Sequence, residues 1–267
     1  MGGGPDTQIG GTLFIHETGS GPAVLLLHGA PSSVAYFDPL VELLAADWRV
    51  LIPEFPGYGH TPFRPGSVRA AIDELDADLA SRGVHEAAVV GFSQGAYRAL
   101  VLALDGKTRV NQIFMMGGFA SLAPAHRDSL RAMGQLLATL PDFQVPALRR
   151  QFATGMVSPG YAAEHPEVFA QIESWIDATT PAALSAEILA GADDADLRPR
   201  LRDLAAPLVA RVGELDQAAP KDYSEELVAL VPAGSLQIVP GRGHALLIED
   251  RAATLAAVKE ALGAGRH

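Results

Sequence analysis

A five-residue segment, Gly-Phe-Ser-Gln-Gly at residues 91–95, has the residue types and spacing to present a serine nucleophile on a sharp turn. It follows an apolar run at 86–90 and precedes a run with helical spacing at 96–104. Glycine at both flanks avoids collisions between the turn and its neighbouring strand and helix. We therefore predict strained dihedrals and a nucleophilic hydroxyl at Ser93. A glycine-rich turn without chemistry fits the bare motif equally well, so the assignment depends on partner residues.

A serine hydroxyl is a poor nucleophile at neutral pH and needs a base within hydrogen-bond reach. The candidate base is His244, which lies between the last predicted strand and the last predicted helix. A loop there can bring the imidazole over Ser93, and the preceding Gly243 lets the backbone turn. The alternative is an ordinary histidine of a surface loop.

A carboxylate is then needed to hold the tautomer of His244 and to stabilise its charged form. Asp216 comes just after the strand predicted at 207–212, and sites in open parallel sheets form at the carboxyl ends of strands. Glu214 competes for this role because it is only two residues away, and a surface salt bridge is the alternative for Asp216. No acidic residue directly follows the strand predicted at 110–116, which favours Asp216.

The oxyanion that forms during attack on a carbonyl needs two N–H donors. We predict that one donor is the backbone N–H of Gln94, directly after the serine. The second is the backbone N–H of Ala30, in the loop that follows the apolar run at 23–27. His28, in the same loop, is interpreted as a structural residue and not as a second base.

Five segments of the chain together resemble the α/β-hydrolase fold family. These segments are His28-Gly29, Pro56-Gly57-Tyr58-Gly59-His60, Gly91-Phe92-Ser93-Gln94-Gly95, Gly213-Glu214-Leu215-Asp216 and Gly243-His244. Within the family, the chain resembles the branch that holds 3-oxoadipate enol-lactonases and cofactor-free haloperoxidase/esterases. The segments Asp196–Leu201 and Ala206–Val209 are similar to the segment after the cap in the enol-lactonases. The resemblance implies a serine hydrolase with an α/β fold and a helical cap.

The chain departs from the usual family pattern at several positions. It has Glu54 where relatives usually carry Asp, His60 where they carry Ser, and Ser-Gln-Gly-Ala at 93–96 where Ser-Met-Gly-Gly is common. We expect Gln94 and His60 to make the mouth of the pocket more polar. Haloalkane dehalogenases and epoxide hydrolases of this fold need Asp as the nucleophile, so Ser93 excludes those activities.

Strands and helices alternate over most of the chain, which is typical of a doubly wound, mostly parallel sheet in an α/β protein. The predicted strands cover residues 12–18, 23–27, 49–52, 87–90, 110–116, 207–212 and 235–239. The predicted helices cover residues 34–46, 68–81, 96–104, 197–204, 221–231 and 245–262.

The alternation stops between residues 121 and 190, where helical patterns are broken by six prolines and no Val/Ile-rich run occurs. We predict a helical cap at 121–190, inserted in a core made of 1–120 and 191–267. Phe152, Trp175 and Ile176 are the candidate pocket residues of the cap. The alternative is that they form the cap's own apolar core.

Composition limits the possible partners. The 267 residues carry a formal net charge of -11 and no cysteine. An acidic surface argues against nucleic acid and anionic membranes, and the lack of cysteine excludes disulfides and thiolate ligands. There is no H-E-x-x-H pattern and no clustered ligand set, so neither a metal nor a cofactor is predicted. The start of the chain does not read as a signal peptide and no apolar run could span a bilayer, so a cytoplasmic location is expected; the oligomeric state stays open.

Together these residues predict a serine hydrolase that cleaves a small carboxylic ester or lactone through an acyl-enzyme. The same groups would support hydrolysis of a C–C bond in a β-diketone, or perhydrolysis. A ligand-binding, receptor-like protein with slow turnover is the alternative from a different class. The fold and the triad set the reaction class, while the cap sets the pocket.

Overall fold

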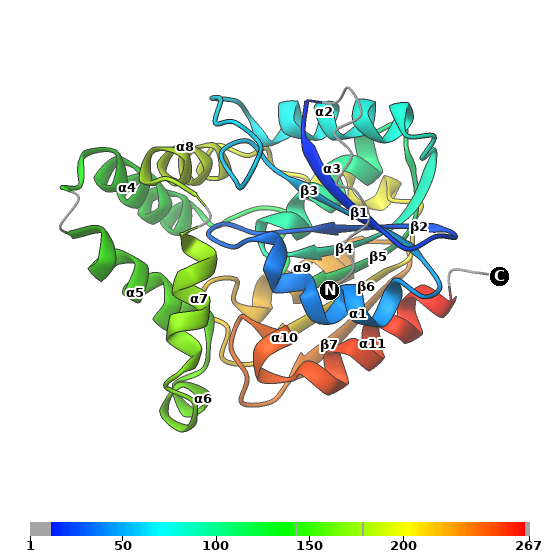
Figure 1. Cartoon of the computed structure of the whole chain (residues 1–267). Helices are drawn as coiled ribbons and strands as arrows, with labels where there is room; N and C mark the ends of the chain where they lie inside the picture. Colours follow the sequence, from blue (N-terminus) through cyan, green and yellow to red (C-terminus); the bar gives the residue numbers. More distant parts are fainter. Residues whose placement is uncertain (1–11, 142–143, 178, 265–267) are drawn as a thin grey trace.

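A seven-stranded sheet forms the centre of the molecule in the computed structural model, which describes residues 12–141, 144–177 and 179–264 (Figure 1). The strand order is β1-β3-β2-β4-β5-β6-β7; β1 is antiparallel to β3, and the other neighbouring pairs are parallel. The strands are β1 (Phe14–Thr18), β2 (Ala23–Leu27), β3 (Arg49–Glu54), β4 (Glu86–Phe92), β5 (Arg109–Met116), β6 (Leu208–Gly213) and β7 (Gly234–Val239). The predicted doubly wound, mostly parallel sheet is therefore confirmed.

The apolar strands divide their side chains between the two faces of the sheet, since successive residues of a strand point to opposite sides. In β2, Leu25 and Leu27 pack into one buried cluster, and Val24 and Leu26 pack into the other. The remaining elements of the core are η1 (Val34–Phe37), α1 (Asp38–Leu44), α2 (Val68–Ser81), α3 (Gln94–Asp105), η3 (Arg198–Asp203), α9 (Lys221–Leu230), α10 (Leu246–Glu249) and α11 (Arg251–Ala264). Because helices cover both faces, the central strand β2 carries only apolar side chains.

Between β5 and β6, the described part of the chain forms five α-helices, which lie together to one side of the sheet (Figure 1). They are α4 (Pro124–Thr139), α5 (Val145–Met156), α6 (Pro159–Glu164), α7 (Val168–Ile176) and α8 (Pro181–Ala192). We call this segment the insertion. Prolines stand in the first turns of four of these helices, where the missing N–H costs nothing, and the hydroxyls of Ser158 and Thr180 cap two of them.

Three predicted helices are wrong in their details. The helix expected at 34–46 is a 3₁₀ turn followed by a short α-helix that ends at Leu44. The helix expected at 197–204 is a 3₁₀ helix, and the final helix expected at 245–262 is broken at Asp250, whose φ is -141°. Periodicity places the apolar face of such segments but does not distinguish a tight or broken helix from a continuous one.

No helix in the described ranges is long and apolar enough to cross a membrane. The prediction about a signal peptide concerns residues 1–7, which lie outside the described residues. In the described part, the carboxyl ends of β4, β5, β6 and β7 point toward the edge from which the insertion emerges, so the insertion and the loops after these strands meet.

Candidate active site

Ser93 stands on the turn between β4 and α3, and its backbone has φ 55° and ψ -121°. This is the one non-glycine residue with positive φ in the described part of the chain, as the strained turn predicts. The turn lies tightly against β2: a Cβ on Gly95 would stand 1.9 Å from the carbonyl oxygen of Leu27. A side chain at that position would push α3 away, so the glycine is required by close approach.

His244 and Asp216 form a buried pair. The Nδ1 atom of His244 lies 2.7 Å from Oδ2 of Asp216, and the two side chains are 2% and 0% exposed. The other carboxylate oxygen of Asp216 accepts hydrogen bonds from the backbone N–H groups of Ala218 and Ala219, at 3.0 and 2.8 Å. Asp216 is therefore held in one orientation, and it fixes Nδ1 of His244 as the donor and leaves Nε2 for other partners.

Glu214, the competing carboxylate, faces elsewhere. Its Oε2 atom accepts a hydrogen bond of 2.9 Å from the backbone N–H of Gly241, and the side chain is exposed. The structure thus pairs His244 with Asp216, not with Glu214.

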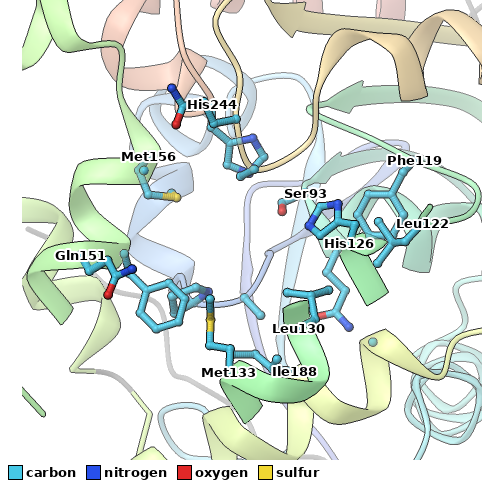
Figure 2. Close-up of a pocket in the computed structure, with 18 of the residues that line it drawn as sticks. Ser93, Phe119, Leu122, His126, Leu130, Met133, Gln151, Met156, Ile188 and His244 are labelled. Atoms are coloured by element: carbon cyan, nitrogen blue, oxygen red, sulfur yellow. The ribbon is translucent and has the colours of Figure 1, made fainter. Parts of the chain in front are cut away.

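Ser93 and His244 line the same cavity of about 300 Å³, together with Ala30 and Gln94 (Figure 2). Gln94 is the first residue of α3, so its N–H is one of those that a helix leaves without an internal acceptor. The positive end of the α3 dipole adds to the attraction for an anion at this point. The two residues predicted to supply oxyanion donors therefore line the same cavity as Ser93.

His28 cannot act as a second base in this arrangement. Its Nδ1 contacts the carbonyl oxygen of Gly29 at 3.0 Å, and the backbone N–H of Phe55 points at its Nε2 at 3.4 Å. Complete burial, with the charge of Arg98 nearby, lowers the pKa of His28 to about 3. The neutral ring joins two loops, which agrees with a structural role.

The cavity wall is mostly apolar. Among the described lining residues there is no Asp, Glu, Lys or Arg. Besides Ser93 and His244, the polar side chains are Gln94, His126, Gln151 and Gln217. Burial lowers the pKa of His126, so this ring is uncharged as well.

The three predicted pocket residues separate in the structure. Phe152 lines the cavity, whereas Trp175 and Ile176 are absent from its described lining. Trp175 is buried and meets the ring of Tyr36 edge-on, with 5.6 Å between ring centroids. Ile176 is also buried, in the apolar cluster that joins the insertion to the sheet. The pocket prediction for these two residues is corrected to a packing role, because their face of α7 turns toward the core.

Two residues that were not identified from the sequence support the pair of His244 and Asp216: one leaves room for the pair, and the other binds the loop before His244. A Cβ on Gly117 would lie 2.7 Å from Nδ1 of His244 and 3.0 Å from Oδ2 of Asp216, so only glycine leaves room for the pair. Glu249 is buried and accepts hydrogen bonds from the N–H groups of Gly243, at 2.9 Å, and Ser158, at 3.0 Å. It joins the loop before His244 to the insertion. Of the two, only Gly117 could have been recognised in the sequence, because it is a glycine directly after a predicted strand.

A third overlooked group is Asp194, where the insertion returns to the core. Its Oδ2 atom is buried and has no hydrogen-bond partner in the described part of the structure. Burial raises the pKa of Asp194 to about 7, although the charges of Arg98 and Arg127 act in the opposite direction. Gln94 lies beside it, so an acid with a strongly shifted pKa stands directly behind the predicted oxyanion donor.

Sequence comparison gives the same fold. A profile of the alpha/beta hydrolase fold family matches residues 22–251. The chain is similar to a pimeloyl-(acyl-carrier protein) methyl ester esterase of Vibrio atlanticus, with 26% identity over 88% of this chain and 92% of the relative. It is also similar to a 2-hydroxy-6-oxo-6-phenylhexa-2,4-dienoate hydrolase of Burkholderia cepacia, with 26% identity over 87% of this chain and 84% of the relative.

Solved structures with the same fold include an esterase and a lactonase. A thermophilic esterase from Thermogutta terrifontis superposes with a TM-score of 0.85 and 24% identity, over 96% of this chain and 94% of that one. The enol-lactonase from Burkholderia xenovorans gives a TM-score of 0.83 and 20% identity, over 94% of this chain and 96% of that one. At these identities the likeness establishes the fold.

Proposed function

The chain belongs to the α/β-hydrolase fold family and is a hydrolase, and we propose that it cleaves a small, neutral carboxylic ester or lactone with a Ser93–His244–Asp216 triad. The observation that carries this proposal is the buried 2.7 Å contact between His244 and Asp216, next to the cavity that Ser93 also lines. A hydrogen-bonded imidazole–carboxylate pair that shares a cavity with a serine in strained dihedrals supports a catalytic role for all three residues.

In the proposed reaction, Nε2 of His244 takes the proton of the Ser93 hydroxyl while the oxygen attacks the substrate carbonyl. The carbonyl oxygen becomes an oxyanion, which the N–H groups of Ala30 and Gln94 stabilise. Asp216 stabilises the imidazolium that results and does not itself need to take the proton. The imidazolium then protonates the leaving alcohol, or the alkoxide end of an opened lactone, and an acyl-Ser93 remains.

Water completes the cycle. His244, again neutral, accepts a proton from water as the water oxygen attacks the acyl carbonyl, and the same two N–H groups hold the second oxyanion. Ser93 leaves with the proton returned by His244, and the acid is released. No step requires a metal ion or a redox cofactor.

The cavity supports the size and charge assigned to the substrate. A volume of about 300 Å³ is at the small end of ligand pockets, which span about 300–1,000 Å³. The described lining offers no cation to pair with a carboxylate, so a free acid group elsewhere on the substrate would be desolvated without a partner. We propose that residues 121–190 act as a cap that selects such substrates, above a core of 1–120 and 191–267.

The relatives support ester cleavage and leave the alcohol and acyl groups open. A relative named as a methyl ester esterase favours a small leaving alcohol. The lactone alternative is supported by the family resemblance. A solved structure with the same fold is an enol-lactonase.

Hydrolysis of a C–C bond is the second candidate, favoured by one observation. A relative over 87% of the chain is named for a 6-oxo dienoate substrate, which contains no ester group. In that reaction the Ser93 oxygen would add to the ketone carbonyl, the same N–H groups would hold the oxyanion, and the C–C bond would break as the imidazolium of His244 protonates the departing carbon. Perhydrolysis, and slow turnover in a ligand-binding protein, would use the same geometry.

A turnover screen separates these possibilities. Purified protein is assayed with p-nitrophenyl esters of increasing chain length, simple lactones and β-diketones, with and without peroxide. Steady turnover of short esters or lactones that disappears in the Ser93→Ala variant supports the proposal. Turnover confined to β-diketones favours C–C hydrolysis, and tight ligand retention without turnover favours the receptor-like alternative.

A further inference from the structure

A cluster of ionisable side chains lies outside the cavity, at the antiparallel edge of the sheet. It consists of His16, Glu54 and His60, and one possible ligand atom from each lies within 4.8 Å of the others. We propose that these three side chains form a binding site for a divalent transition-metal ion of the Zn²⁺ type. The site is separate from the proposed triad, which does not need it.

The strand register places the first two ligands together. His16 on β1 pairs with Ile52 on β3, and Glu54 lies two residues farther along β3. Directly paired residues share a face of the sheet, and so do residues two apart on one strand. His16 and Glu54 are therefore diagonal neighbours on one face, close enough for long side chains to meet. Their side chains do so, at 2.8 Å between Nε2 of His16 and Oε1 of Glu54.

The loop after β3 returns the third ligand to the same place. The hydroxyl of Thr61 accepts a hydrogen bond of 2.9 Å from the backbone N–H of Phe14, which ties the end of the loop to β1. The backbone N–H of His60 donates to the Glu54 carboxylate. The ring of Phe14 also stacks on the imidazole of His60, with 4.4 Å between centroids. The backbone and the ring of His60 are thus held before any metal binds.

The distances between His60 and Glu54 match those of a tetrahedral site. Zn–N and Zn–O bonds of about 2.0–2.1 Å at tetrahedral angles put two ligand atoms about 3.3 Å apart. Nδ1 of His60 lies 3.3 and 3.4 Å from the two carboxylate oxygens of Glu54. The 2.8 Å contact of His16 with Glu54 needs to lengthen by about half an ångström. A side-chain rotation of that size leaves the backbone in place.

The exposure of the three side chains fits the same assignment. The side chain of Glu54 is 5% exposed, while those of His16 and His60 are 28% and 65% exposed. An ion can enter from the solvent side and keep water as its remaining ligand.

The ligand types select the metal. Two imidazoles and one carboxylate suit Zn²⁺, Ni²⁺, Co²⁺ and Cu²⁺, whereas Mg²⁺ and Ca²⁺ prefer oxygen ligands. A bound ion would join an edge strand, the end of β3 and the loop at 55–61. That loop also contacts the insertion, since Tyr58 forms a β-bridge with Thr179. We expect metal binding to stabilise the folded protein without supplying a reacting group.

The test is a titration of tag-free, full-length protein with ZnCl₂, followed by calorimetry and by thermal unfolding. The expected result is one high-affinity equivalent of Zn²⁺ and an increase in Tm. His60→Ala and His16→Ala should each weaken this binding at least about ten-fold, since even residues behind a metal ligand cost 10- to 100-fold. Both should also remove most of the Tm increase.

Control variants distinguish this site from others. His165→Ala removes another histidine that contacts a glutamate, with 3.2 Å between Nδ1 of His165 and Oε1 of Glu167, but without a second imidazole. It should keep the full affinity, and so should His244→Ala, which removes the imidazole of the proposed triad. His60→Gln provides a conservative variant if His16→Ala fails to fold, because His60 is largely exposed.

Two outcomes would overturn the proposal. One is the absence of Zn²⁺ binding to the unmodified protein, which would leave the cluster as a hydrogen-bonded clamp around Glu54. The other is binding that survives both His60→Ala and His60→Gln, which would place the ion elsewhere. Either result is independent of ester turnover, so it leaves the proposed function untouched.

Discussion

The two sides of the cavity are built in different ways. The sheet side presents Ser93 and His244 on short turns that hydrogen bonds and close backbone contacts hold in place. The insertion side presents mostly apolar side chains from three helices; the lining residues there are His126, Leu130, Met133, Leu148, Gln151, Phe152, Gly155, Met156, Ile188 and Gly191. The contribution of a polar group on the sheet side depends on its orientation, whereas the contribution of an apolar group on the insertion side depends on the volume that it fills. Substitutions on the sheet side should therefore change the rate of catalysis, and substitutions on the insertion side should change the selectivity among substrates.

The largest effect is expected for Ser93→Ala on the sheet side. Loss of the nucleophile should lower kcat by about 10⁴-fold or more, because removal of one member of a triad disables all of it. Labelling by a fluorophosphonate probe should disappear together with turnover. Labelling that persists in this variant would show that another serine is the nucleophile.

The next effect separates the two carboxylates. Asp216→Asn should keep the fold but lower kcat by about 10³–10⁴-fold, since the imidazole loses its orienting charge. Glu214→Gln is the matched control: it removes an exposed carboxylate that bonds only a loop N–H, and kcat should change by less than about ten-fold. The opposite ranking in steady-state kinetics would assign the acid to Glu214.

The sheet side was also the more predictable from sequence. Ser93, Asp216 and His244 each follow a strand, and the carboxyl ends of neighbouring parallel strands meet at one edge, so strand order alone groups them. Helical periodicity on the insertion side does not say whether an apolar face meets the cavity or the sheet, which is why Phe152 and Trp175 could not be separated.

Other residues were hidden because their partners are distant in the chain. Glu249 acts through Ser158, 91 residues away. The cluster of His16 and Glu54 depends on the register of the antiparallel pair β1 and β3, which no local spacing encodes. Topology can be predicted from the alternation of helices and strands. A side-chain contact between the core and the insertion, or between two paired strands, can be identified only in the folded structure.

Trp175→Ala tests the insertion side as a packing element. Its ring is 7% exposed and contacts Tyr36, which in turn stacks on Phe92, the residue before Ser93. Truncation should lower the free energy of unfolding by about 3–5 kcal/mol, as for other large-to-small changes in a core. The preference among ester chain lengths should stay the same. Denaturant unfolding and an ester series measure the two quantities, and a changed preference without a loss of stability would return Trp175 to the pocket.

The pH dependence of folding stability tests the role of Asp194, which lies where the insertion returns to the core. Its pKa of about 7 in the folded protein exceeds the value of about 3.9 in an unfolded chain, so the folded state holds a proton that the unfolded state releases. The stability contribution of this group is therefore full below about pH 4 and is lost as the pH rises to about 7.

The Asp194→Asn variant should not lose this stability as the pH rises, because its side chain does not ionise. The free energy of unfolding of the variant, relative to the unmodified protein, should increase by up to about 4 kcal/mol between pH 4 and pH 8, since one pKa unit corresponds to about 1.4 kcal/mol. Asp193→Asn is the control, because this exposed neighbour pairs with Arg131 at the surface. Denaturant unfolding at several pH values measures both variants, and parallel profiles for the two would contradict the assignment.

The smallest effect, and the sharpest test of the comparison, is expected for Phe152→Ala. Its ring lines the cavity, so truncation should open space for a longer acyl chain while Ser93 and His244 stay in place. Each methylene that becomes buried contributes about 0.8 kcal/mol, so two of them should raise kcat/KM for a hexanoate relative to a butyrate ester by about ten-fold. Phe169→Ala is the control: this phenylalanine also belongs to the insertion, but it packs under Arg150, 4.2 Å from the ring centroid, and is not among the cavity residues. Its ratio of hexanoate to butyrate should stay at the original value. A shift of equal size in both variants would mean that loosening the insertion changes selectivity, and the division between a rate-setting side and a volume-setting side would no longer hold.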